Sequence, residues 1–131
     1  MAANYEIQVQ QGETFQLHMT YKDNDNTVVD LSSYTGRMQV RRSLISGSVL
    51  LDIDSSGVTS GISGGTGSVA MNTSATGGSL TGGVLITADA VSMALVPSGR
   101  HFYDLELVSG ATVSRILQGR FDCSGEITRW N

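Results

Sequence analysis

Cysteine and histidine are almost missing from this chain of 131 residues, and their scarcity excludes several kinds of site. The single Cys123 has no partner for an internal disulfide and cannot build a zinc site from several thiolates. We expect it to be a small buried core residue. The two histidines, His18 and His101, do not stand at the spacing of a metal-ligand pair. The sequence therefore predicts no metal site and no cofactor.

Basic charge is also scarce, with 8 Lys and Arg residues against 12 Asp and Glu and a net charge of −4. A general nucleic-acid binder needs a basic field that displaces counterions from phosphates, so we expect no nucleic-acid partner. Lys22 is the only lysine, and the other cations are arginines. Arg is favoured at contact surfaces because its planar fork pairs bidentately. A genomic bias towards Arg explains the same count, and both interpretations stay open.

Long apolar runs are missing as well. The first six residues contain neither the basic nor the apolar region of a signal peptide. No uncharged apolar stretch approaches the length that spans a membrane. We therefore expect synthesis in the cytoplasm and no membrane partner.

No set of residues in the sequence matches a catalytic site. The acids Asp52 and Asp54, like Asp104 and Glu106, alternate along one strand face, and such acids are usually solvated. The Gly-x-Ser-x-Gly spacing at 61–65 lies in a loop without a partner histidine. The sequence predicts that the chain is not an enzyme.

The apolar residues that are present recur mostly with a period of two, which is typical of β-strands. Strands are expected at 5–10, 15–21, 34–42, 49–54, 83–87, 100–108, 112–117 and 120–124, with one or two helical turns at 88–95. Thr87 is a candidate N-cap of that helix, and Asp89 lies near its start. Seven or eight short strands with polar turns predict a single-domain, all-β, antiparallel β-sandwich over residues 1–131.

The strongest strand is 100–108. Tyr103, Leu105 and Leu107 fall on one face, which we expect to be the core face. Asp104 falls on the other face. It is expected to be an exposed acid or to pair with an arginine on a neighbouring strand, Arg115 or Arg37.

Charge is entirely missing from Ser55 to Ala88, and nine of the 16 glycines lie between Gly57 and Gly83. We expect 55–83 to be a Gly/Ser-rich loop or arm. Two alternatives would hold this segment in place. In the first, it folds back onto its own sheet, with 68–71 as a short strand. In the second, which we prefer, neighbouring subunits clamp it. Deletion of 57–83 is then expected to leave a folded monomer that no longer binds its partner. The candidate interface residues are Gly57, Ile62, Val69, Met71, Leu80, Arg37, Arg41, Arg129 and Trp130.

Several motifs follow one another in a recognisable order. They are Gly12-Glu13-Thr14-Phe15, Tyr21-Lys22-Asp23, 29–34, 37–41, Tyr103-Asp104-Leu105, 115–119 and Glu126-Ile127-Thr128-Arg129. This order resembles the immunoglobulin-like domain that is found at the N-terminus of phage baseplate upper proteins and in many small virion proteins of tailed phages. The resemblance covers almost the whole chain and implies an immunoglobulin-like sandwich. The expanded middle at 55–83 departs from the pattern.

The resemblance implies a structural component of a tailed-phage virion, made in the host cytoplasm, whose partners are other virion proteins and copies of itself. We prefer a role in decorating or cementing the capsid, because we expect no receptor-binding region beside the sandwich. A tail or baseplate component is the alternative. A carbohydrate- or ligand-binding sandwich is a third hypothesis, although only Trp130 and Tyr34 look available for stacking on sugars. A glycan screen would separate it from the structural role.

Overall fold

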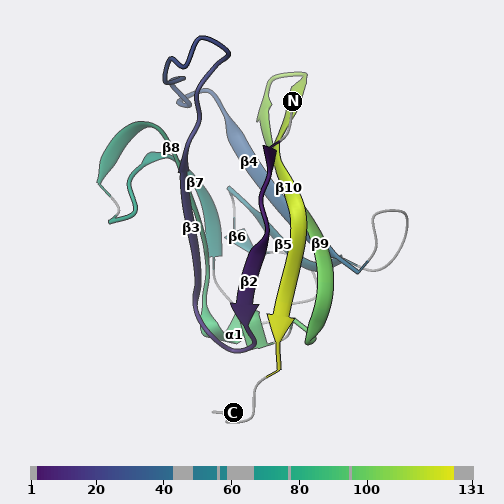
Figure 1. Cartoon of the computed structure of the whole chain (residues 1–131). Coiled ribbons are helices and arrows are strands. Elements are labelled where there is room, and N and C mark those ends of the chain that lie inside the picture. Colours follow the sequence, from purple (N-terminus) through teal and green to yellow (C-terminus); the bar gives the residue numbers. More distant parts are fainter. Residues whose placement is uncertain are drawn as a thin grey trace.

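The computed structural model describes residues 3–42, 49–55, 57–58, 67–76, 78–94 and 96–125. Within these ranges the regular structure is almost entirely strand, with one short helix (Figure 1). The elements are β1 (Ala3–Asn4), β2 (Ile7–Gln10), β3 (Phe15–Thr20), β4 (Thr35–Arg41), β5 (Val49–Asp54), β6 (Gly57–Val58), β7 (Gly67–Thr73), β8 (Ser79–Ala88), α1 (Ala90–Ala94), β9 (Gly99–Ser109) and β10 (Thr112–Ser124).

The strands form two facing sheets, so the predicted all-β sandwich is confirmed. The larger sheet has the order β1-β10-β9-β4-β5-β6, with β2 following β1 along the same edge of β10. The smaller sheet has the order β3-β8-β7. This arrangement has the strand order of a variable-type immunoglobulin sandwich. One sheet contains β10, β9, β4, β5 and β6 in that order, and the facing sheet contains β3, β8 and β7.

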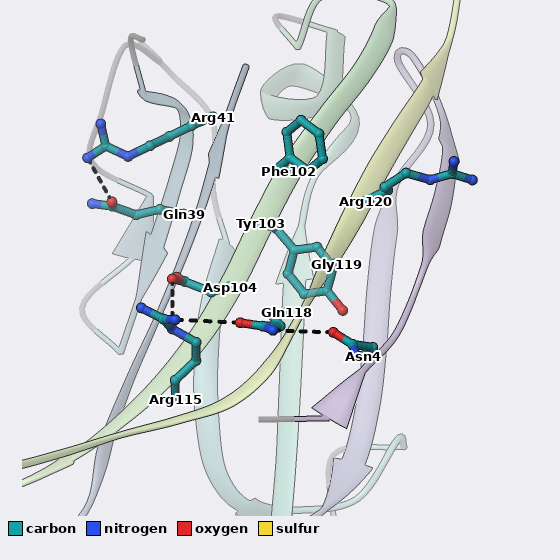
Figure 2. A pocket seen from close by; sticks show the side chains of 10 residues that line it. All are labelled: Asn4, Gln39, Arg41, Phe102, Tyr103, Asp104, Arg115, Gln118, Gly119 and Arg120. Carbon is teal, nitrogen blue, oxygen red and sulfur yellow. Dashed lines mark hydrogen bonds and ion pairs between the residues drawn. The ribbon is translucent and has the colours of Figure 1, made fainter. Parts of the chain in front are cut away.

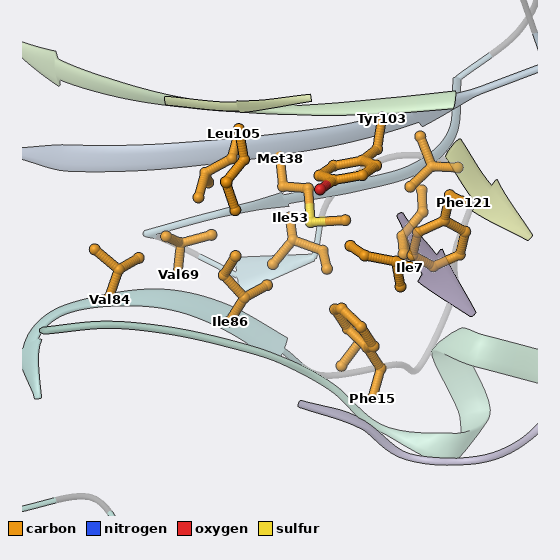
Figure 3. Close-up of a cluster of buried hydrophobic side chains, with 14 of the residues drawn as sticks. Ile7, Phe15, Met38, Ile53, Val69, Val84, Ile86, Tyr103, Leu105 and Phe121 are labelled. Atoms are coloured by element: carbon orange, nitrogen blue, oxygen red, sulfur yellow. The ribbon is translucent and has the colours of Figure 1, made fainter. Parts of the chain in front are cut away.

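The core lies between the sheets and is built from the inner residues of alternating strands (Figure 3). Tyr103, Leu105 and Leu107 of β9 are at most 3% exposed, as the alternation predicted. At one end of the core the ring of Phe121 meets the rings of Phe15 and Tyr103 edge-on, with centroids 5.8 and 6.4 Å apart. These aromatic contacts join β3 to β9 and β10, and so hold the two sheets together.

The pairing of the first strands corrects the expectation of a purely antiparallel sandwich. β1 and β2 both run parallel to β10, with Ala3 opposite Leu117 and Ile7 opposite Phe121. Alternation along a strand indicates which face is buried but not which strand it pairs with. The two strands expected at 112–117 and 120–124 are one continuous strand, β10, with an irregularity between Arg115 and Leu117.

The Gly-rich segment 55–83 is not all loop. Residues 57–58 pair with β5, 67–73 form β7, and 79–83 are the first half of β8. For 67–73 the fold-back alternative is confirmed, because β7 pairs with β8. Small residues allow the sheets to approach closely here: a Cβ on Gly36 would lie 2.5 Å from Cγ1 of Val69. Deletion of 57–83 removes β7 and half of β8, so the structure contradicts the expectation of a folded monomer.

The short helix lies where it was expected, but its cap differs. The carboxylate of Asp89 accepts a 2.9 Å hydrogen bond from the backbone N–H of Ser92, which is the contact of an N-cap side chain. Thr87 instead belongs to β8. The helix buries Met93 and closes one end of the sandwich (Figure 1).

Candidate functional site

The outer face of the larger sheet carries ordered rows of polar side chains. Alternation places the apolar residues of β4, β9 and β10 inside, so their polar partners point outward. Cross-strand pairing then aligns the outward residues, which are polar except for Phe102, in three rows: Arg37 with Glu106 and Arg115, Gln39 with Asp104 and Gln118, and Arg41 with Phe102 and Arg120.

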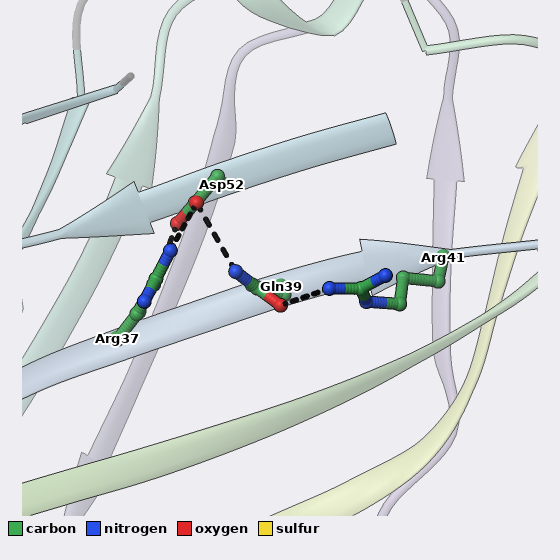
Figure 4. A network of polar contacts seen from close by, with 4 residues as sticks. All are labelled: Arg37, Gln39, Arg41 and Asp52. Carbon is green, nitrogen blue, oxygen red and sulfur yellow. Dashed lines mark hydrogen bonds and ion pairs between the residues drawn. The ribbon is translucent and has the colours of Figure 1, made fainter. Parts of the chain in front are cut away.

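One polar network joins β4 to β5 (Figure 4). Arg37 donates to both carboxylate oxygens of Asp52, from Nε at 3.1 Å and from Nη2 at 2.7 Å. Gln39 donates to the same carboxylate at 3.1 Å and accepts at 3.1 Å from Arg41. The Asp52 side chain is 5% exposed, whereas that of Arg37 is 52% exposed. The hydrogen bonds from Arg37, followed by those from Gln39, hold the pKa of Asp52 below its ordinary value against the opposing effect of burial.

A second network joins β9, β10 and β1 (Figure 2). The guanidinium group of Arg115 lies 3.3 Å from the carboxylate of Asp104 and donates to Gln118 at 3.5 Å. Gln118 in turn donates to the side chain of Asn4 at 3.3 Å. Of the two pairings expected for Asp104, the structure forms the one with Arg115.

Arg120 connects this face to the N-terminal segment. Its Nη2 lies 2.6 Å from Glu6 and 3.6 Å from Asp122, which also faces Arg100 at 3.8 Å. The hydrogen bond from Arg120 lowers the pKa of Glu6. Arg100, Glu6 and Arg120 are 38–63% exposed and Asp122 is 28% exposed, so solvent screens these pairs and they contribute little to stability. They fix where the side chains lie.

A hollow of about 540 Å³ opens between the networks. Figure 2 shows Arg41 and Gln39 on one side, Asn4 and Gln118 on another, and Phe102 between them. Phe102 is partly buried and lies directly across from Arg41 on β4 and Arg120 on β10. The hollow combines two aromatic residues, Phe102 and Tyr103, with amide, guanidinium and carboxylate groups, an arrangement typical of small-molecule sites.

The structure does not bring the predicted interface residues into one site. Arg37 and Arg41 lie on the outer face of the larger sheet, and Gly57 lies in β6. Val69 is 1% exposed and belongs to the core, so its assignment as an interface residue was wrong. Met71 packs partly against the core, whereas Leu80 is 40% exposed. Ile62, Arg129 and Trp130 lie outside the described residues.

Sequence reasoning missed Phe102. The available signal was its phase: it alternates with Tyr103 and shares the outward face of β9 with Asp104 and Glu106. An aromatic residue that interrupts a row of acids on a solvent face has no packing role in the core. Its position is therefore a stronger indication of binding than either histidine.

A second surface lies at the edge of the smaller sheet. β3 pairs with β8 on one side only. Because Tyr21 donates to Gly82, odd-numbered residues of β3 face β8, and the backbone groups of Gln16, His18 and Thr20 point away from it. A groove of about 230 Å³ separates this edge from β2.

The two histidines serve the fold. His101 is 1% exposed, and its Nε2–H donates at 2.7 Å to the carbonyl of Pro97, which ties the start of β9 to the turn after α1. Nε2 of His18 lies 2.9 Å from the carbonyl of Thr73 and holds the β7–β8 hairpin over β3.

In the part of the chain that the structure describes, no three His, Cys, Asp or Glu side chains gather as metal ligands would. Within the same residues, no helix has the length and apolar character needed to cross a membrane. No family model matches the chain, and no curated protein matches it in sequence.

Proposed function

We propose that this chain is a non-enzymatic structural protein of a tailed-phage virion, which docks on the particle. Docking on the capsid exterior, as a decoration or cement protein, is the preferred form of the proposal, and a tail or baseplate position is its alternative. The order of motifs from Gly12-Glu13 to Glu126-Ile127 supports the virion assignment. The sandwich described above is compatible with the fold that this resemblance implies.

The observation that carries the docking proposal is the open edge of β3. Three consecutive outward residues, Gln16, His18 and Thr20, present backbone donors and acceptors without a neighbouring strand among the described residues. Beside this edge Val9, Leu17 and Met19 are only partly buried against the core. An extended segment of a neighbouring virion protein, with apolar side chains at every second position, would pair with β3 and cover these residues. Such strand addition is a recurrent way for sheet proteins to join an assembly.

A proline on the β3 edge tests this mode of docking. Gln16→Pro removes an outward backbone N–H, and edge strands tolerate proline when the lost donor faces solvent. The variant also loses the 2.8 Å bond from the Gln16 side chain to the carbonyl of Ala75. Gln16→Ala is the matched control, because it loses the same side-chain bond but keeps the N–H.

The measurement is co-sedimentation of each purified protein with virions that lack the chain. We expect the wild type and Gln16→Ala to sediment with the particles and Gln16→Pro to remain in solution while keeping its circular dichroism spectrum. Equal binding of all three proteins would show that docking does not use this edge.

The number of copies per virion tests the location. Peptides of the chain are quantified by mass spectrometry in gradient-purified virions of the virus that encodes it, relative to the major capsid protein. A copy number comparable to that of the capsid subunits would support capsid decoration. A copy number equal to the few subunits of one symmetric ring would support a position in the tail. Their absence from purified particles would contradict the virion role altogether.

A further inference from the structure

Three arginines line the hollow on the larger sheet, and one of them, Arg41, donates to the side-chain amide of Gln39. The guanidinium groups of Arg115 and Arg120 each face a carboxylate of the chain itself, Asp104 and Glu6 respectively. A strongly anionic ligand would have to compete with these carboxylates for the same donors. Because two of the three arginines already face a carboxylate of the chain, we expect the hollow to favour an uncharged ligand that is recognised through directed hydrogen bonds.

The lining offers many such bonds from side chains whose positions are already fixed. Gln39, Gln118 and Asn4 each contain an amide, which both donates and accepts. Gln39 is held between Arg41 and Asp52, and Gln118 is held between Arg115 and Asn4. Binding groups that are ordered before the ligand arrives lose little entropy when it binds.

Phe102 supplies the apolar part of the hollow. It lies in the row next to that of Gln39, Asp104 and Gln118, and neighbouring rows on one face of a sheet are about 7 Å apart. A ligand ring that rests on Phe102 therefore brings groups on its rim within reach of that polar row. Sugars combine an apolar C–H face with hydroxyl groups around the ring, and they match this arrangement.

We propose that the hollow between Phe102, Gln39 and Gln118 binds a neutral saccharide. Its volume of about 540 Å³ lies within the range of small-molecule sites, about 300–1,000 Å³. Asp104 accepts hydrogen bonds from the sugar hydroxyls with the carboxylate oxygen that Arg115 leaves available. This site lies on the larger sheet, and no residue of β3 lines it. The tests of saccharide binding and of docking through the β3 edge are therefore independent of each other.

The first test uses the unmodified chain. Glucose, galactose, mannose, N-acetylglucosamine and their common disaccharides are titrated into isotope-labelled protein, with glucuronate and acetate as anionic probes. We expect at least one neutral sugar to give saturable amide shifts that centre on residues 102–104 and 118–120. Binding of glucuronate and acetate without any neutral sugar would replace the proposal with an anion site. Shifts that centre elsewhere, or no binding by any probe, would overturn it.

The second test uses matched variants. Phe102→Ala and Asp104→Asn are expected to weaken the binding of the selected sugar by about 10- to 100-fold. Glu106→Gln is the control, since Glu106 lies on the same face of β9 but outside the hollow, and its affinity is expected to equal that of the wild type. If Phe102→Ala fails to fold, Phe102→Leu replaces it, because leucine keeps the apolar bulk. We expect this variant to lose affinity for the sugar as well, because it lacks the flat ring. Unchanged affinity in the folded variants would contradict the assigned site.

Discussion

The phenol of Tyr103 donates a 2.6 Å hydrogen bond to the backbone carbonyl of Tyr5, a residue 98 positions earlier in the chain. Tyr103 belongs to β9, and Tyr5 lies where the chain passes from β1 to β2. The backbone N–H of Tyr5 donates to the carbonyl of Gln118 at 2.9 Å. The crossing between the two N-terminal strands is therefore fixed from two sides.

Removal of this phenol should loosen the N-terminal strands. Tyr103→Phe leaves the carbonyl of Tyr5 without this donor, and we expect the free energy of unfolding to fall by about 1–2 kcal/mol. Urea denaturation measures the change, and hydrogen exchange should accelerate most within residues 3–10. Tyr5→Phe is the control, because it keeps the carbonyl and alters only a half-exposed side chain. Equal destabilisation by both variants would argue against the hydrogen bond as the cause.

Gly119 makes room for the same crossing. A Cβ at this position would overlap the carbonyl oxygen of Tyr5. We expect Gly119→Ala to lower the free energy of unfolding by about 1–3 kcal/mol, because the backbone of Tyr5 must move and because the positive φ of Gly119, 155°, disfavours a side chain. Gly110 has a positive φ of 58° but nothing near its Cβ position, so Gly110→Ala measures the cost of φ alone. A smaller loss at Gly119 than at Gly110 would refute the steric explanation.

The Arg37–Asp52 pair predicts a dependence of stability on acid. The folded pKa of Asp52 is lowered, so its contribution is complete above the ordinary aspartate pKa of about 3.9 and is lost as the pH falls through the folded value. We expect Asp52→Asn to cost about 1–3 kcal/mol at pH 7 and progressively less below pH 4, as measured by urea unfolding at several pH values. Asp25→Asn, on an exposed loop, is the control for the change of an aspartate to an asparagine. A cost that stays constant with pH would contradict the role of the charge.

β7 gives a direct test of whether the Gly-rich segment belongs to the fold. Val69 is fully enclosed, and Leu80 is 40% exposed. We expect Val69→Ala to lower the melting temperature and to cost about 1.5–3 kcal/mol, whereas Leu80→Ala should cost far less. Thermal and urea unfolding of both variants would check this. If both substitutions lowered stability by similar, small amounts, residues 67–73 would not be part of the folded core.

The strands with strict alternation were predictable from the sequence. In β4 and β9 the sequence places apolar residues such as Met38 and Tyr103 at every second position, and each lies inside. The parallel pairing of β2 with β10 was not predictable, because alternation along Ile7 and Val9 is the same for either neighbour. β7 was only one of two alternatives, a short strand at 68–71 or an arm clamped by neighbouring subunits, because glycine and serine around Val69 are typical of linkers.

The candidate site was predictable only in part. Arg37 and Arg41 were identified as surface cations, and the pairing of Asp104 with Arg115 was among the alternatives. The hollow forms only because β4, β9 and β10 are neighbours in the sheet. The register of these three strands places Arg41 and Arg120 beside Phe102. Register is a property of the assembled sheet, and no local pattern in this chain encodes it.

The parallel attachment of β1 and β2 to β10 also has a consequence for biogenesis. β1 and β2 precede the other described strands in the chain but pair with β10, the last of them, so this part of the larger sheet forms only after β10 has been synthesised. Contacts between residues so distant in sequence give a high contact order, which is associated with folding in milliseconds to seconds. Until β10 emerges, the edge of β2 is an unpaired strand exposed to other nascent chains.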